Sequence, residues 1–201
     1  PGGHLLAYDL KSGRCEDLGL APEGEAVLAM GMDTRRGAIY GITWPVGIFF
    51  CFDVASGTWR NLGPVSGQGE SGSGTTYRVL CRSIPIDPET GVAYFTNPEG
   101  DIFYYEPGAD RVARLVGEDM RKDYFGRYVP HDSGCMGYHW RQVVWHPREK
   151  VFYGVHGNSG YLFRFDPRQP RIDVLERLTS GPSRRSGMGD QFSYGYLGFT
   201  L

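Results

Sequence analysis

The chain has 201 residues, of which 30 are glycine and 13 are proline, so these two types make up about a fifth of it against a usual share of about an eighth. So many helix breakers argue against a helical bundle, and an aromatic content of 14% argues against disorder. A formal net charge of -2 gives no polycationic surface for nucleic acid, and no apolar run reaches the roughly 18 residues that a membrane span needs.

Two short phrases alternate along the chain and reveal an internal repeat. In the second phrase, Asp33, Asp87 and His146 are each followed seven residues later by a tyrosine. A period of about 40 to 60 residues with four short strands per unit is typical of a β-propeller. The first phrase reads LLAYDLKSG (5–13), FFCFDVASG (49–57), IFYYEPGAD (102–110) and LFRFDPRQP (162–170), and the second reads MGMDTRRGAIYGIT (30–43), IPIDPETGVAYFTN (84–97) and VVWHPREKVFYGVH (143–156).

We therefore predict an all-β propeller built from four-stranded antiparallel blades. Each acid at the end of a strand is expected to start a tight turn, and we expect His146 to cap its turn as the aspartates do. Three complete blades form an arc, so we expect a fragment of a six- to eight-bladed ring, with a closed four-blade ring as the alternative. The partial first blade is expected at 4–18, the complete blades at 28–62, 82–115 and 141–178, and the first strand of a further blade at 194–201. Strands are expected at 28–33, 38–43, 48–53 and 58–62, at 82–87, 92–96, 102–106 and 112–115, and at 141–146, 151–156, 161–166 and 172–178.

The blade order predicts where a binding site lies. The segments that enter each blade (63–81, 116–140 and 179–193) are long and open on the same face as the loops between second and third strands. Turns on the opposite face, such as 34–37 and 88–91, are short. Because long loops in a compact domain are usually functional or disordered, we expect the site on the face of the entry segments.

Two arginines, Arg82 and Arg141, stand at the start of an inner strand in neighbouring blades. A guanidinium binds carboxylate, sulfate or phosphate as a planar fork, so this pair is predicted to bind an acidic ligand. The alternative is that each arginine braces loop carbonyls or pairs with a nearby carboxylate.

Tyr138 and His139 precede Arg141 directly, and Tyr77 and Arg78 occupy the corresponding place one blade earlier. A neutral histidine can act as a general base and a tyrosine can donate a proton. We therefore interpret Tyr138 and His139 as catalytic candidates that could remove the C5 proton of a uronic acid, with the alternative that they only pack the entry segment. Further substrate-binding candidates are Arg78, Tyr77 and the two tryptophans that could stack on sugar rings, Trp44 and Trp140.

No cofactor is expected. A metal site built from His131, Asp132, His139 and His156 is conceivable, although their spacing matches no compact ligand motif. Cys15 and Cys51 are expected to be small buried strand residues. Cys81 and Cys135 lie in equivalent entry segments and would be able to pair if the protein is exported.

The phrases AYDLKSGRCEDLG, FDVASGTWRNLG and DTRRGAIYGITWP resemble the blades of bacterial propellers related to oligogalacturonate lyases and ulvan lyases, and of uncharacterised exported propellers. The resemblance implies Arg, His and Tyr at one channel mouth, an acidic saccharide as ligand, and cleavage by β-elimination of uronate-containing glycans. It favours a periplasmic or extracellular location. The second hypothesis is a noncatalytic scaffold that mediates protein–protein interaction in a larger multidomain protein, because a fold of this kind hosts many functions.

Overall fold

The computed structural model describes residues 2–70, 79–122, 138–156 and 161–177. This part of the chain forms four antiparallel β-sheets and a single 3-10 turn at Pro22–Gly24. The first sheet pairs β1 (His4–Tyr8) with β2 (Cys15–Leu20), and the second contains β3 (Ala26–Asp33), β4 (Ala38–Trp44), β5 (Ile48–Asp53) and β6 (Thr58–Pro64). The third contains β7 (Ala93–Thr96), β8 (Asp101–Glu106) and β9 (Arg111–Asp119), and the fourth contains β10 (Trp140–His146), β11 (Val151–His156), β12 (Tyr161–Asp166) and β13 (Arg171–Arg177).

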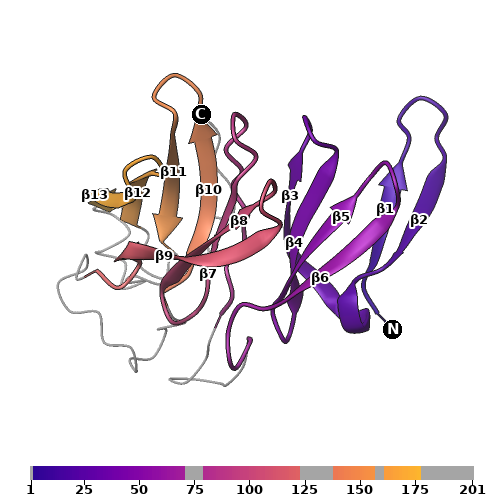
Figure 1. Ribbon diagram of the computed structural model, residues 1–201, viewed down its shortest axis with the longest axis horizontal. Helices are drawn as coiled ribbons and strands as arrows, with labels where there is room; N and C mark the ends of the chain where they lie inside the picture. The colour runs from indigo at the N-terminus through magenta and orange to yellow at the C-terminus, as the bar shows by residue number, and fades with distance from the viewer. Residues whose placement is uncertain (1, 71–78, 123–137, 157–160, 178–201) are drawn as a thin grey trace, which may run out of the picture.

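Every sheet is a simple meander in which strands that follow one another in the chain are hydrogen-bonded neighbours. The sheets stand side by side in chain order, from β1–β2 at the right of Figure 1 to β10–β13 at the left. This is the predicted arrangement of successive blades, and the strand bounds of the second and fourth sheets lie within a few residues of the expected ones.

The structure corrects the expectation of an inner strand at 82–87. Only an isolated bridge between Ile86 and Ala93 forms there, so the third sheet has three strands among the described residues. Pro85 has no backbone N–H and accepts one bond, from the Tyr94 N–H at 2.9 Å, while Asp87 N–H donates to the Val92 carbonyl at 3.0 Å. The segment follows the path of an inner strand, but the proline interrupts its ladder. Residues 194–201, expected to begin a further blade, lie outside the described residues.

The turn acids act as the repeat predicts. The side chains of Asp33 and Asp87 each accept a backbone N–H from two residues further on, at 3.0 and 2.8 Å. His146 caps its turn with a ring nitrogen instead, because its Nδ1 accepts the Glu149 N–H at 3.1 Å. The structural role expected for His146 is therefore confirmed.

The core lies between the sheets and joins them. The Phe49 ring of β5 stacks on the Phe95 ring of β7 with centroids 4.3 Å apart, and Tyr94 meets Phe165 of β12 edge to face at 5.3 Å. Burying each such ring stabilises the fold by roughly 1.5–3 kcal/mol. At Gly31 of β3, an added Cβ would overlap the Ile84 carbonyl oxygen, so glycine permits the close approach of the third blade to the second.

Candidate functional site

The predicted face is built from three described segments that lie against one another. The β4–β5 loop, residues 45–47, meets the segment that leaves β6, because the Val65 N–H donates to the Gly47 carbonyl at 3.0 Å. Glu70 N–H donates to the Pro45 carbonyl at 2.8 Å and closes the far side of that contact. The β7–β8 loop, residues 97–100, belongs to the next blade and faces the segment 64–67.

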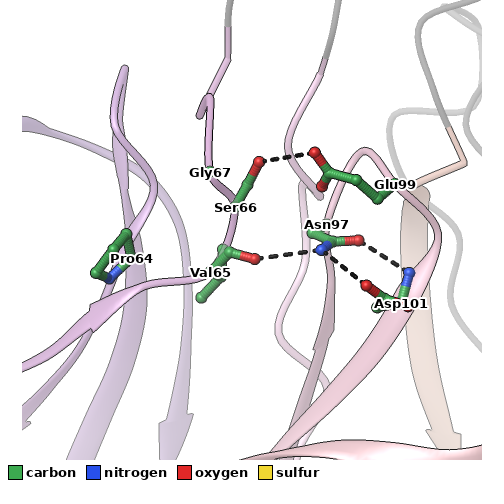
Figure 2. A pocket seen from close by; sticks show the side chains of 7 residues that line it. All are labelled: Pro64, Val65, Ser66, Gly67, Asn97, Glu99 and Asp101. Carbon is green, nitrogen blue, oxygen red and sulfur yellow. Dashed lines mark hydrogen bonds between the residues drawn. The ribbon is translucent and has the colours of Figure 1, made fainter.

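An open pocket of about 420 Å³ lies between the second and third sheets on this face. Figure 2 shows its two walls, with the segment after β6 on one side and the β7–β8 loop on the other. The described residues that line it are Pro64, Val65, Ser66, Gly67, Asn97, Glu99 and Asp101. Sequence reasoning placed the site on this face but missed these residues. The available signal was the three alternating polar side chains of Asn97, Glu99 and Asp101, directly after a buried strand.

Asn97 holds the two walls together (Figure 2). Its Nδ2 donates to the Val65 carbonyl across the blade boundary at 3.3 Å and to Asp101 Oδ2 at 3.4 Å. Its Oδ1 accepts the Asp101 N–H at 2.9 Å. The side chain is buried and both ends of the amide are used, so Asn97 is a structural member of the pocket.

Carboxylates give the pocket its polar character. Ser66 Oγ donates to Glu99 Oε1 at 3.2 Å. The Arg121 guanidinium donates to the Glu99 carbonyl at 2.7 Å and to Asp101 Oδ1 at 3.0 Å, and it also pairs with Asp119 at 2.9 Å. Arg121 therefore fixes the β7–β8 loop from behind.

Arg82, predicted to clamp an acidic ligand, is engaged within the protein. Its two terminal nitrogens donate to the two oxygens of Glu70 at 2.7 and 2.9 Å, and one of them also donates to the Leu80 carbonyl at 3.2 Å. Glu70 is only 6% exposed, so this bidentate pair is largely shielded from solvent. The arrangement matches the alternative in which the arginine pairs with a nearby carboxylate.

His139 and Trp140 are completely buried. Trp140 Nε1 donates to the Ser83 carbonyl at 3.0 Å, and its backbone N–H donates to Thr96 Oγ1 at 3.1 Å. The structure thus assigns Trp140 to the core between two blades, which corrects its expected role in stacking on a sugar. The Trp140–Ser83 bond places the segments that carry Arg82 and Arg141 side by side.

Trp44 is the last residue of β4, and Tyr138 lies just before β10. Tyr138 packs against Gly100, and its N–H donates to the Pro98 carbonyl at 3.0 Å, so it belongs to the surroundings of the β7–β8 loop. Trp44 is 46% exposed, as is Val46 beyond Pro45. Arg141 is half-buried. Tyr77 and Arg78 lie outside the described residues, so their predicted roles in substrate binding stay predictions.

The structure describes some of the histidines and cysteines that have predicted roles and not others. Burial lowers the pKa of His156, opposite Trp140 in the β10–β11 ladder, to about 3. No group of three or more His, Cys, Asp or Glu side chains in the described ranges could hold a metal ion, and His131 and Asp132 lie outside them. Burial raises the pKa of Cys81 to about 11, and a pairing with Cys135 stays a prediction because Cys135 is not described.

The other two cysteines differ from each other. Cys51 is buried as expected, and its Sγ lies 3.1 Å from an Arg60 guanidinium nitrogen. Cys15, which was also expected to be buried, is exposed at the start of β2. Among the described residues the first sheet has only two strands, and little of that part of the chain covers Cys15.

Comparison with solved structures shows the fold. Virginiamycin B lyase from Staphylococcus aureus matches 89% of this chain over 50% of its own, with a TM-score of 0.59 and 11% identity. The C-terminal WD40 domain of Sif2 matches 89% over 42% of its own, with a TM-score of 0.57 and 14% identity, and a chain of a nidogen/laminin complex matches 88% over 58%, with 0.56 and 11%. The chain thus spans about half the length of these structures.

No protein-family model matches the chain, and no curated protein matches it either. At identities this low the structural likenesses show the fold alone, and the fold is a β-propeller, as predicted. None of the helical segments in the described ranges has the length and apolar character to cross a membrane.

Proposed function

We propose that the protein is a noncatalytic binding propeller that recognises a saccharide on the face of the blade-entry segments. The observation that carries the proposal is the polar pocket between the second and third sheets, on the same face as the exposed Trp44 at the end of β4. Saccharides need both features, because their hydroxyl groups form hydrogen bonds while their C–H faces pack on aromatic rings.

The polar side of the pocket supplies groups that suit sugar hydroxyls. Ser66 offers a hydroxyl, which both donates and accepts, and Asp101 offers carboxylate oxygens that each accept more than one hydrogen bond. The backbone of the 64–67 segment adds further polar groups. Asn97 and Arg121 hold these groups in place, so a ligand would meet walls that are already ordered.

The exposed Trp44 stands at the start of a firmly held β4–β5 loop. Glu25 caps the β4–β5 loop, because its carboxylate accepts the Thr43 hydroxyl and lies 3.3 Å from the Val46 N–H. The Pro45 carbonyl is held from the other side by the Glu70 N–H. Trp44 therefore ends a strand whose following loop is held from both sides, which suits a stacking platform.

The positions of the predicted catalytic and anion-binding residues do not support β-elimination. A catalytic base must reach the proton that it removes, and His139 has no exposed surface. An anion clamp must offer its charge to the ligand, and the Arg82 guanidinium is already held by both oxygens of Glu70. The lyase hypothesis drawn from the sequence therefore gains no support from these residues.

The test uses the full chain with saturation-transfer NMR against neutral and uronate oligosaccharides. We expect saturation of at least one sugar and a loss of roughly tenfold or more in affinity in Trp44→Ala. Tyr8→Ala is the matched control, since Tyr8 is an exposed aromatic residue on the first sheet, away from the pocket. A folded protein that saturates no sugar, or a Trp44→Ala variant that binds like wild type, would contradict the proposal.

The second candidate is the protein-interaction scaffold. It is favoured by the exposure of Val46 beside Trp44, because a fixed apolar pair on a loop resembles the anchor of a protein interface. A competition experiment distinguishes the two candidates. Saccharide would displace a protein partner bound through Trp44 only if the pocket itself binds sugar.

A further inference from the structure

We propose that two copies of this chain associate head to tail, with the fourth sheet of each copy packing on the first sheet of the other. An aromatic pair recurs where one described sheet packs on the next, and the first and fourth sheets each hold one half of such a pair. The surface concerned is separate from the pocket, so the association goes beyond saccharide binding and does not depend on it.

The recurring pair consists of one aromatic residue from each of the two repeated phrases. Tyr40 of the second sheet, from the second phrase, has its ring centroid 5.2 Å from that of Tyr105 in the third sheet. Tyr94 of the third sheet meets Phe165 of the fourth at 5.3 Å. Tyr105 and Phe165 both hold the fourth position of the first phrase. The same two repeat positions therefore meet at both of these sheet boundaries.

The first sheet exposes its half of the pair. Tyr8 holds the fourth position of the first phrase in β1, and it is 62% exposed. Leu6 lies on the same side of the strand, because side chains alternate, and it is 60% exposed. The matching residues of the second sheet, Phe50 and Phe52, are at most 1% exposed. Two apolar side chains are thus open to solvent at positions that the neighbouring sheet buries.

The fourth sheet holds the other half. Tyr153 of β11 is its tyrosine from the second phrase, and the described ring contact of this residue is with His146 of the same sheet, at 5.7 Å. The first and fourth sheets stand at opposite ends of the row of sheets (Figure 1), so Tyr153 and Tyr8 of one copy are far apart. In a head-to-tail arrangement, Tyr153 meets the partner's Tyr8.

The size of the assembly agrees with a closed ring. Each copy has four described sheets, so two copies bring eight, which is within the usual number of propeller blades. The chain also spans only about half the length of the propellers that it matches, 50% for the lyase and 42% for the WD40 domain. A head-to-tail contact closes into a ring when its rotation allows, and both exposed flanks are then covered twice.

The first test is the oligomeric state of the 201-residue chain, measured by sedimentation equilibrium at micromolar concentrations. We expect the mass of two chains. Tyr8→Glu places a charge in the contact and should weaken the association by about tenfold or more, while the exposure of Tyr8 lets the fold tolerate it. Leu10→Glu is the matched control, because Leu10 is 90% exposed in the β1–β2 turn, and it should change the dissociation constant by less than about twofold.

The second test identifies which surfaces meet. Cys15 is first replaced by serine, because it is exposed and lies opposite Tyr8 in the β1–β2 ladder. Tyr8→Cys and Tyr153→Cys proteins are then made in this background, mixed, and treated with a short bis-maleimide linker. A head-to-tail contact joins unlike positions, so we expect the two variants to be linked to each other in the mixture and not within either variant alone.

Each outcome decides the matter. A chain that remains monomeric throughout overturns the proposal, and so does a dimer that Tyr8→Glu leaves intact or that links within one variant alone. Open polymers of increasing mass would contradict a closed pair. A doubled mass, weakening by Tyr8→Glu but not by Leu10→Glu, and links only in the mixture together support it. None of these results changes the test of saccharide binding, which uses Trp44.

Discussion

The side-chain nitrogen of Asn97 lies 3.3 Å from the backbone oxygen of Val65, and this contact joins the second and third blades beside the pocket. Thr43 stands at the same register in the second sheet, three residues after the repeat tyrosine. Its Oγ1 accepts the Ile48 N–H at 2.9 Å, as Asn97 Oδ1 accepts the Asp101 N–H. His156 has this position in the fourth sheet, and all three side chains are buried. The repeat therefore includes a buried polar residue where the second strand ends.

Asn97→Asp should destabilise the fold sharply. The donating Nδ2 would become a carboxylate oxygen, facing the Val65 carbonyl and the Asp101 carboxylate without a proton to share. We expect a loss of about 3 kcal/mol in the free energy of unfolding at pH 7, measured by urea denaturation. Asn61→Asp makes the same change at an exposed position and should cost no more than about 0.5 kcal/mol. Equal losses in the two variants would show that the inter-blade contact is unimportant.

His146→Asp should be tolerated, whereas His146→Ala should not. Aspartate is the residue that caps the corresponding turns at Asp33 and Asp87, and its oxygen can accept the Glu149 N–H that His146 Nδ1 accepts now. Alanine offers no acceptor, so we expect it to lower the free energy of unfolding by about 1 kcal/mol while aspartate stays within about 0.5 kcal/mol of wild type. Thermal and urea unfolding of the three proteins provide the comparison, and similar losses for both variants would contradict the assigned cap.

The strand order and the turn acids could be predicted because they depend on neighbours in sequence. An acid such as Asp33 bonds to an N–H two residues away, and the aromatic strand that follows alternates within the same unit. The strand predicted at 82–87, which the described residues do not form, has a local cause as well. Pro85 interrupts the hydrogen-bond ladder, but the match of this segment to the repeat still predicted a strand.

The site was harder to predict because its residues are joined across blades. Arg82 looks like a ligand clamp from its register, and only the fold shows that Glu70, twelve residues earlier, takes both of its terminal nitrogens. Trp140 looks like a loop aromatic, and only the bond to Ser83, 57 residues away, shows that it closes a blade boundary. Topology predicts which segments share this face, but it does not predict the charge pairing among them.

Substitution of Trp140 should lower stability, whereas substitution of Trp44 should weaken saccharide binding. Trp140→Phe keeps most of the buried ring but loses the Nε1 donor to the Ser83 carbonyl, so we expect a cost of about 1–3 kcal/mol. Trp44→Ala removes a side chain that is nearly half exposed and should cost less than about 1 kcal/mol while it weakens saccharide binding by roughly tenfold or more. Urea denaturation and the NMR binding assay on both variants test this division. A stable Trp140→Phe protein with weakened sugar binding would reverse the two assignments.

The buried His156 should make the fold sensitive to mild acid. Burial lowers its pKa to about 3, whereas an unfolded histidine titrates near 6.5. Between these values the unfolded chain binds a proton that the folded chain does not, so the stabilising contribution is complete above pH 6.5 and falls as the pH is lowered. One proton corresponds to about 1.4 kcal/mol per pH unit.

His156→Asn is the variant that tests this sensitivity, because asparagine already occupies the equivalent position at Asn97. Across pH 4.5 to 6.5 we expect the slope of unfolding free energy against pH to be smaller than in wild type by about 1.4 kcal/mol per unit. The window stops above the range in which Asp9, Asp53 and Asp166 titrate, since hydrogen bonds hold their pKa values below the usual one. His4→Asn removes an exposed histidine and should keep the wild-type contribution of His156. If His156→Asn and wild type share one slope, His156 takes up its proton in the folded state, and the buried position must open to water well below the free energy of global unfolding.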